Sequence, residues 1–357
     1  MSECMVIAEA GVNHNGSLQL ALELIDVAAQ AGADVVKFQT FDAARLVTAA
    51  ASKADYQVAN TRDAGSQLQM LRQLELSHDD HRALVARARE RDIRFMSTAF
   101  DDESLAFLAT LDMPALKVPS GDLTCAPLLL QAARLRKPLI VSTGMASLAE
   151  VEQALGVLAF GLASDSEPRS SADFEEAYRS REGRNALEQH VTLLHCVTEY
   201  PAPLETVNLR AMDTLAAAFG LPVGYSDHTL GIEVAIAAAA RGAVVIEKHF
   251  TLDRTLPGPD HAASLEPAEL RQLVAAVRKV QCALGSPIKQ PAPAEIPNRA
   301  VARRSIVAAR PIRAGERFAA GMLSAKRPGT GLSPMAWWNL IGKTATRDYQ
   351  TDEVIDP

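Results

Sequence analysis

Short apolar segments alternate with amphipathic, helix-like segments from the start of the chain to Gly285. The apolar segments are rich in Val, Ile and Leu, as expected for a parallel sheet that is buried on both faces. Eight of them are predicted as strands: Met5–Glu9, Asp34–Gln39, Ile93–Thr98, Ala115–Val118, Pro138–Ser142, Val191–Cys196, Pro222–Tyr225 and Ala243–His249.

The intervening segments carry apolar residues at helical spacing. Ser17 is expected to cap a helix over Leu18–Ala31, and Ser77 to cap another that ends near Glu90. Further helices are predicted at Ser104–Leu111, Ala126–Leu135, Leu148–Phe160, Leu209–Phe219, Gly231–Arg241 and Pro267–Leu284. Repeated βα units in this number predict an α/β protein, a closed (β/α)8 TIM barrel, with an open doubly wound sheet as the alternative.

Two connections are longer than a barrel requires. Residues 43–65 follow the second strand, where the active-site loops of barrels occur. Residues 164–189 are polar and highly charged, which predicts an inserted surface excursion, with a lid over a site as the alternative.

The barrel pattern ends at Gly285, so residues 1–285 are predicted as one domain. Residues 286–298 are rich in proline and are expected to form a semi-rigid linker. Residues 299–357 contain several short segments separated by turn residues, and they are expected to form a small second domain.

The composition is that of an ordinary globular protein. Of 357 residues, 48% are hydrophobic and 22% charged, and the net charge of −7 does not favour a nucleic-acid partner. Neither a secretory leader nor an apolar run long enough to cross a membrane is visible, so a cytoplasmic location without membrane contact is expected. The four widely spaced cysteines are expected to remain reduced.

Every predicted strand ends in groups that can bind or ionise. The carboxyl ends of barrel strands surround the active site, so these groups are expected to share one site. They include Glu9, Lys37, Gln39, Ser97, Thr98, Lys117, Ser120, Asp122, Ser142, Glu199, Tyr200, Ser226, Asp227, His228, Glu247, Lys248 and His249.

His228 and His249 end neighbouring strands, and barrel closure places Glu9 next to them. Two imidazoles and a carboxylate on consecutive strands are a candidate site for a divalent metal with open positions. Hydrogen-bonded structural histidines are the alternative.

Lys37 and Lys117 are expected to be buried at the barrel mouth, where a lysine is costly without an anion. A phosphate or carboxylate ligand is the favoured partner, and an ion pair with Glu9, Asp122 or Glu247 is the alternative. A Schiff-base lysine is also possible, because burial lowers the pKa of a lysine.

The sequence strings at these strand ends resemble the sialic acid synthases, the N-acetylneuraminate synthase (NeuB-like) group. The strings are EAGVNHNGS, VVKFQT, STAF, KVPSGD, STGM, LHCVTEYPAP, GYSDHTLG and EKHFTLDRTLPGPDH. SIVAARPIRAGERF and AKRPGTGL resemble the C-terminal SAF domain of that family, which is antifreeze-like and of the β-clip type. The resemblance covers nearly the whole chain except residues 164–189.

The resemblance implies a transferase that condenses phosphoenolpyruvate with the open-chain aldehyde of an N-acyl-mannosamine-type sugar. The new bond forms from C3 of phosphoenolpyruvate, water adds at C2, and phosphate leaves by C–O cleavage. A divalent metal, usually manganese, with magnesium or cobalt as alternatives, would polarise the aldehyde and the water.

The resemblance also implies residue roles. His228 and His249 would hold the metal, and Glu9 would orient or deprotonate the water. Lys37, Thr98, Lys117, Ser120, Ser142 and Ser226 would bind phosphoenolpyruvate, and Gln39, Asp122, Tyr200, Asp260 and Arg327 would bind the sugar. Arg327 would come from the SAF domain of a second copy, which implies a domain-swapped homodimer.

Three positions depart from the family pattern and leave the sugar open. Asp122 stands where glutamate is frequent, Thr198 where some members carry asparagine, and Val301 where an aromatic residue occurs. N-acetylneuraminate from N-acetylmannosamine is the expected product, with legionaminic acid from 2,4-diacetamido-2,4,6-trideoxymannose as the alternative. A metal-free Schiff-base aldolase and a non-catalytic carbohydrate- or ice-binding protein are the competing functions.

Overall fold

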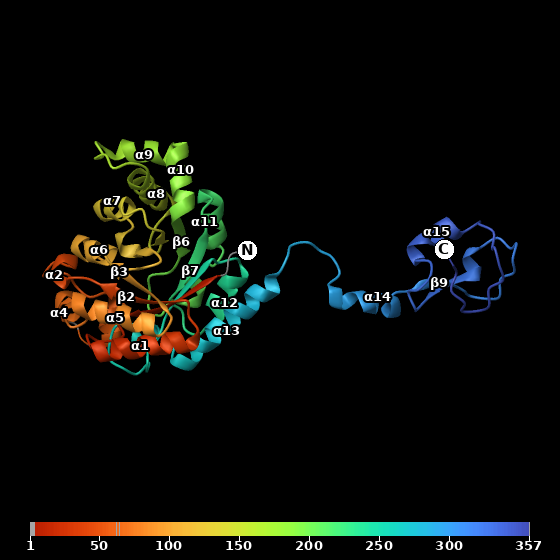
Figure 1. Ribbon diagram of the computed structural model, residues 1–357, viewed down its shortest axis with the longest axis horizontal. Coiled ribbons are helices and arrows are strands. Elements are labelled where there is room, and N and C mark those ends of the chain that lie inside the picture. Colours follow the sequence, from red (N-terminus) through yellow and green to blue (C-terminus); the bar gives the residue numbers. More distant parts are fainter. Residues whose placement is uncertain (1–3, 62, 64, 357) are drawn as a thin grey trace. The chain divides into compact units, whose positions relative to one another are not determined.

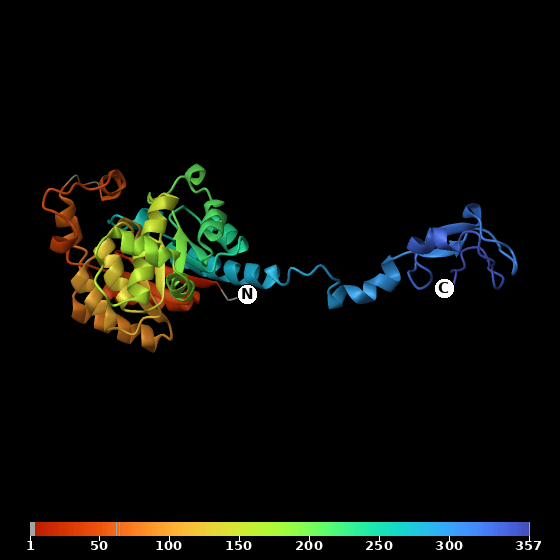
Figure 2. The ribbon, with the colours of Figure 1, turned by 90° about the horizontal axis from the view of Figure 1, so that it is seen from above.

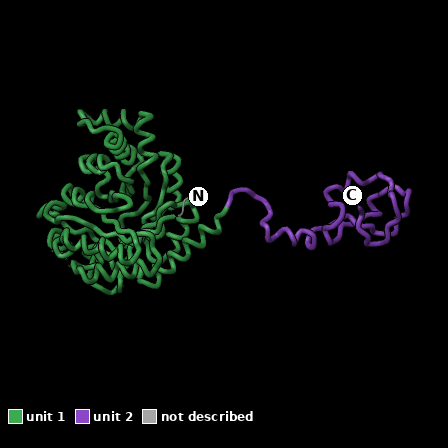
Figure 3. Tube along the Cα trace, in the orientation of Figure 1, with its two compact units in different colours: residues 1–285 green, residues 286–357 purple. Residues whose placement is uncertain are grey.

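The computed structural model describes residues 4–61, 63 and 65–356. The chain divides into two compact units, one ending at Gly285 and the other covering residues 286–357 (Figure 3). Each unit has its own hydrophobic core. Among the described residues, no helix is long and apolar enough to cross a membrane.

The first unit is a closed barrel of parallel strands, so the predicted (β/α)8 fold is confirmed and the open sheet is excluded. Pairing runs in chain order, and β1 closes the ring against β8 with Glu9 opposite His249. The strands within the described residues are β1 (Met5–Gly11), β2 (Val35–Thr40), β3 (Arg94–Ala99), β4 (Leu116–Val118), β5 (Leu139–Ser142), β6 (Val191–His195), β7 (Val223–Asp227) and β8 (Val245–His249).

Helices surround the barrel (Figures 1 and 2). The Ser17 side chain accepts a hydrogen bond from the backbone of Leu20, and Ser77 forms a reciprocal capping box with Asp80, so both predicted caps are confirmed. The helices that follow the strands in the repeating units are α1 (Leu18–Ala31), α5 (His78–Glu90), α6 (Asp102–Ala109), α7 (Ala126–Arg134), α8 (Leu148–Ala163), α11 (Ala211–Phe219), α12 (Glu233–Ala240) and α13 (Pro267–Leu284).

The inside of the barrel is apolar towards the amino ends of its strands. Ile7, Val35, Met96, Ile140 and Val245 form a small buried cluster there. Alternate residues of a strand face the same side. The next inward positions, two residues further along each strand, are therefore Glu9, Lys37, Thr98, Ser142 and Glu247, which place polar groups above an apolar floor.

The long connection after β2 is folded rather than irregular. It contains α2 (Ala43–Leu46) and α3 (Asp55–Thr61), and α4 (Gln67–Arg72) follows. Lys53 is buried and ties the segment together, because its Nζ donates to the backbone oxygen of Asp63 at 2.9 Å and pairs with that carboxylate at 2.8 Å.

Residues 164–189 also fold into helices, which the polar composition did not predict. They form α9 (Ser171–Arg179) and most of α10 (Arg181–His190), and Ser170 and Ser180 cap the two starts. Both helices pack on α8, with the rings of Phe160 and Phe174 edge to face at 5.5 Å. The segment is a surface layer of the barrel unit (Figure 1).

The second unit is built around an antiparallel pair, β9 (Ser305–Ala308) and β10 (Leu323–Lys326). Ile306, Phe318, Met322 and Tyr349 are among its core residues. Two helices flank the pair in sequence, α14 (Ile296–Ala302) and α15 (Trp337–Leu340), so the stretch expected as a linker already contains the first residues of α14. The 3-10 turns of the described chain are η1 (Ser120–Asp122), η2 (Leu204–Thr206), η3 (His261–Ala263), η4 (Pro293–Glu295), η5 (Ala320–Met322) and η6 (Pro334–Ala336).

Candidate functional site

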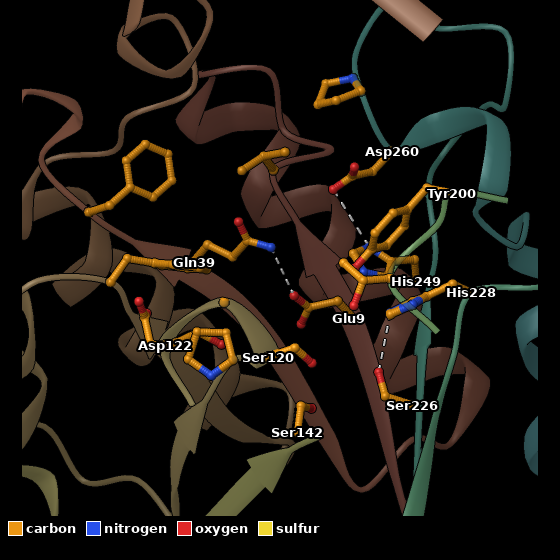
Figure 4. A pocket seen from close by; sticks show the side chains of 18 of the residues that line it. Glu9, Gln39, Ser120, Asp122, Ser142, Tyr200, Ser226, His228, His249 and Asp260 are labelled. Atoms are coloured by element: carbon orange, nitrogen blue, oxygen red, sulfur yellow. Dashed lines mark hydrogen bonds and ion pairs between the residues drawn. The ribbon is translucent and has the colours of Figure 1, made fainter. Parts of the chain in front are cut away.

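A cavity of about 430 Å³ opens at the carboxyl ends of the barrel strands (Figure 4). It is lined by all the barrel residues that the sequence singled out for metal, phosphoenolpyruvate or sugar: Glu9, Lys37, Gln39, Thr98, Lys117, Ser120, Asp122, Ser142, Tyr200, Ser226, His228, His249 and Asp260. Arg327 is exposed in the second unit, directly after β10. The structure therefore brings the predicted barrel residues together, and the role of Arg327 stays a prediction.

Glu9 lies at the centre of the cavity, between Gln39 and the two imidazoles (Figure 4). Its carboxylate accepts a hydrogen bond from Gln39 at 3.4 Å. The strand bends just beyond it, because Gly11 has a φ of +54° and the pairing with β2 is irregular there. A Cβ at position 11 would lie 3.2 Å from the His249 ring, so glycine gives the imidazole its space.

The two buried lysines are paired with carboxylates of the protein. Lys37 Nζ lies 2.8 Å from Glu9 and 3.5 Å from Glu247, and Lys117 Nζ lies 3.7 Å from Glu247. Of the ion pairs considered as the alternative for these lysines, those with Glu9 and Glu247 are present in the described structure and one with Asp122 is not, and Glu247 bridges the two lysines. The two lysines and two carboxylates balance one another in charge.

Hydroxyl groups surround the same lysines. Lys37 donates to Thr98 at 3.0 Å, and Lys117 donates to Ser142 at 2.7 Å. Ser226 donates to Glu247 at 2.8 Å, and the Ser120 hydroxyl accepts from the backbone N–H of Gly144 at 3.0 Å. Ammonium and hydroxyl donors on four adjoining strands form a cradle suited to an oxyanion.

Burial and charge together shift the pKa values of the two carboxyl groups in opposite directions. Burial raises the pKa of Glu9, and it outweighs the opposing effect of the Lys37 ammonium. Burial would also raise the pKa of Glu247, but Lys117 and Lys37 together lower it below the ordinary value. Glu247 is therefore the fixed anion of the pair, and Glu9 is the one poised to take up a proton.

The two imidazoles face each other at 5.6 Å between ring centroids, and the Tyr200 ring lies 4.2 Å from His228 and 5.7 Å from His249. His228 Nδ1 lies 2.6 Å from the carbonyl oxygen of Val197. Since a carbonyl can only accept, Nδ1 carries the hydrogen and the Nε2 lone pair faces the cavity. Burial lowers the pKa of His228 to about 4 and that of His249 well below its usual value, so both rings are neutral.

These features fit a divalent cation. Neutral imidazoles are frequent metal ligands, and a carbonyl that accepts from the other ring nitrogen and so fixes the tautomer is typical of such sites. His249 Nδ1 is buried without a hydrogen-bond partner in the described structure and lies 3.9 Å from the Asp260 carboxylate, so this nitrogen is not committed to a protein hydrogen bond. No group of three or more His, Cys, Asp or Glu side chains within the described chain is arranged around a metal position, so further ligands would have to be water or substrate.

The outer part of the cavity combines carboxyl groups with an apolar wall. Burial raises the pKa of Asp122 and that of Asp260 to about 6 each. The side chains of Val12, Phe41, Met70 and Leu74 form a buried apolar cluster that lines the same cavity.

Sequence reasoning missed several lining residues. Glu247 was expected among the strand-end groups but was given no role beyond an ion pair, although its position two residues before His249 points it into the same cavity. Tyr56 of α3 also lines the cavity. Asn60 of the same helix lies outside the lining, and it donates to the backbone oxygen atoms of Pro259 at 2.6 Å and Tyr200 at 3.3 Å. Residues of that connection could not be predicted from their position, because they do not stand at the end of a barrel strand.

Comparison with known proteins agrees with this geometry. Residues 24–289 match the NeuB family, and residues 303–357 match the SAF domain. The chain belongs to the NeuB family. The predictions of a sialic-acid-synthase-type chain with a SAF domain, and of a phosphoenolpyruvate-dependent transferase, are thereby confirmed.

Individual NeuB-family proteins are similar along most of the chain. N,N'-diacetyllegionaminic acid synthase of Campylobacter jejuni is 47% identical over 355 residues, which cover 99% of each chain. The Legionella pneumophila protein of the same name is 47% identical over 339 residues, covering 95% of this chain and 89% of the relative. The crystal structure of an N-acetylneuraminic acid synthetase from Leptospira borgpetersenii has 32% identity and a TM-score of 0.66, and it covers 83% of this chain and 90% of that one.

Proposed function

We propose that this NeuB-family enzyme condenses phosphoenolpyruvate with 2,4-diacetamido-2,4,6-trideoxymannose to form N,N'-diacetyllegionaminic acid. The observation that carries the proposal is the 47% identity, nearly end to end, to two proteins named for that product. The similar sialic acid synthetase structure has 32% identity. The expected substrate therefore changes from N-acetylmannosamine to the sugar first considered as the alternative.

The apolar wall of the cavity supports this choice of sugar. The proposed substrate has a methyl group at C6 in place of a hydroxymethyl group, and it carries a second acetamido methyl. Burying each such carbon against Phe41, Met70 and Leu74 is worth about 0.8 kcal/mol. A hydroxyl placed against the same wall would lose water without gaining a partner.

Phosphoenolpyruvate is assigned to the lysine and hydroxyl cradle. Lys37 and Lys117 would supply the charge, and Thr98, Ser120, Ser142 and Ser226 the neutral donors. The anion would take over the ammonium groups that Glu9 and Glu247 hold in its absence. Ser226 joins the two parts of the site, because its hydroxyl oxygen lies 3.3 Å from His228 Nε2.

Glu9 is assigned the role of general base. It is 1% exposed, lies between the imidazoles and Gln39, and has a pKa raised by burial to about 7. A carboxylate with a pKa near the working pH can take a proton from water that adds to C2 and hold it afterwards. Gln39, Asp122, Tyr200 and Asp260 line the remaining surface and are assigned to the sugar.

The proposed cofactor is one divalent ion held by His228 and His249, with manganese preferred over magnesium and cobalt. When bound, such an ion would polarise the aldehyde of the sugar and acidify water. The other side chains keep their own tasks, because binding of the anion and proton transfer by Glu9 depend on groups of the barrel itself.

The test is phosphate release from phosphoenolpyruvate with each of the two sugars, with and without manganese. The expected result is kcat/KM at least tenfold higher for the diacetamido sugar, and activity that disappears with a chelator. A higher kcat/KM for N-acetylmannosamine would overturn the choice of sugar. Full activity in chelator, with borohydride trapping of a pyruvate adduct, would instead support the Schiff-base aldolase.

A further inference from the structure

A buried ion pair lies directly behind the two imidazoles. Lys248 Nζ is 2.9 Å from the carboxylate of Asp227, and both side chains are fully buried. Neither side chain lines the cavity, and neither takes part in the proposed chemistry. In the pairing of β7 with β8, Asp227 stands opposite Lys248, one position before His228 and His249 respectively.

A third residue closes the arrangement. The Asp227 carboxylate accepts from both the backbone N–H and the hydroxyl of Thr229, at 2.9 and 2.8 Å. Lys248 donates to the backbone oxygen of Thr229. Thr229 is itself fully buried. These bonds bridge His228, because they join Asp227 and Thr229 on either side of it. They also link this turn to Lys248, the residue that precedes His249.

Alternation along the strands makes this connection effective. Ser226, His228, Glu247 and His249 line the cavity, whereas Asp227 and Lys248, at the alternate positions of the same strands, do not. A change in the Asp227–Lys248 contact would therefore move the backbone from which each imidazole extends. The inner face alone does not fix their separation, because among the described residues no hydrogen bond joins the two imidazole rings.

We infer that Asp227, Lys248 and Thr229 form a positioning unit that sets the separation and direction of His228 and His249 for a divalent cation. The inference rests on the two histidines being the metal ligands of the proposed function. A buried ion pair is weak evidence for stability, because desolvation of both charges offsets their attraction. The role of the Asp227–Lys248 pair is therefore inferred from its geometry, because the pair holds in register the two backbone segments that carry the histidines.

The test uses a double variant, Asp227→Asn with Lys248→Met, so that no unpaired charge remains buried. Manganese chloride is titrated into the metal-free full-length protein, and free Mn²⁺ is followed by electron paramagnetic resonance. The expected result is a folded protein whose Kd for Mn²⁺ is raised by roughly tenfold to a hundredfold, as for other residues behind metal ligands. A folded double variant with a Kd within twofold of the natural protein would overturn the inference.

Three further variants make the result decisive. If the double variant does not fold, Lys248→Arg, which keeps the charge and changes the geometry, takes its place: a Kd raised at least threefold supports the inference and an unchanged Kd overturns it. Asp26→Asn removes a carboxylate that joins α1 to Arg87 of α5 and to Arg91 just after it, so it should lower the thermal midpoint and leave the Kd unchanged. Loss of Mn²⁺ binding in His228→Ala, combined with a normal double variant, would overturn the positioning unit alone, whereas normal binding in His228→Ala would overturn both it and the metal site.

Discussion

Asp122 lies at the edge of the cavity with one carboxylate oxygen buried and without a hydrogen-bond partner in the described structure. Burial raises the pKa of Asp122 to about 6. An unpaired buried carboxylate is a cost to the folded state, and such a cost is typical of a group kept for a ligand. The assignment of Asp122 to a sugar hydroxyl would explain why the cost is tolerated.

Replacing Asp122 by Asn should change the pH dependence of stability. The pKa of the carboxyl rises on folding from 3.8 to about 6, so the folded state binds more protons than the unfolded state between these values. The free energy of unfolding of the natural protein therefore falls as pH rises from about 4 to 6, and the variant lacks this fall. At pH 7 the variant's thermal midpoint should exceed the natural one by about 2 °C more than at pH 4, allowing for the partial solvent access of the group. A difference in midpoint that does not vary with pH would contradict this.

The sequence predicted the barrel side of the site well because strand periodicity fixes which residues face inward. Glu9, Lys37 and His249 could be placed from their position at strand ends alone. The ion pairs of the two lysines were foreseen only as an alternative, since which carboxylates they reach depends on distances across the barrel. Tyr56 could not be predicted for another reason, because it enters the site from a connection whose path is set by contacts such as Lys53 with Asp63.

Strands and main helices were predicted to within a few residues, and the end of the last barrel helix at Leu284 was placed correctly. The structure differs most from the prediction in residues 164–189. Their charge suggested a solvated excursion, yet Ser170 and Ser180 start two helices and Phe174 and Leu187 supply the inward faces. In this segment the N-cap residues were more informative than composition.

Phe174→Ala should lower the stability of the barrel unit without changing its catalytic rate. The variant loses the edge-to-face contact with Phe160, and since Phe174 is only partly buried the free energy of unfolding should fall by about 1–2 kcal/mol. The catalytic rate should remain unchanged, because α9 does not line the cavity. Denaturant unfolding and phosphate release measure the two quantities. Glu175→Ala, on the exposed face of α9, is the matched control, and a loss of kcat in Phe174→Ala would indicate that the layer has a catalytic role.

The molecule as a whole consists of two units with separate cores, and the cavity described above belongs to the first. The predicted sugar contact of Arg327, and the domain-swapped homodimer that it implies, come from the family resemblance and stay predictions. An exposed guanidinium at the end of a short strand is available for a bidentate contact with polar groups. Whether Arg327 acts on the site of another copy can be tested in solution by mixing two variants that each lack a different residue of the site.

Arg327→Ala and Glu9→Gln should each be poorly active when assayed alone. Glu9→Gln removes the base and should cost roughly 10²–10⁴ in kcat, and Arg327→Ala should raise the KM for the sugar. If Arg327 acts on the site of another copy, mixing and exchanging the two variants restores about a quarter of the natural activity, because half of the dimers then contain one intact site. Mixtures of each variant with itself are the control, and an absence of recovery would contradict action between copies.

Glu9 and Glu247 act as built-in counter-ions for Lys37 and Lys117 while the cavity holds no anion. If phosphoenolpyruvate binds these lysines as proposed, its binding would be an exchange of partners rather than the filling of a bare positive pocket. The same carboxylates would compete for the ammonium groups once phosphate has been split off. Such a barrel would give up some affinity for its anionic substrate and would gain a site from which the departing phosphate is readily released.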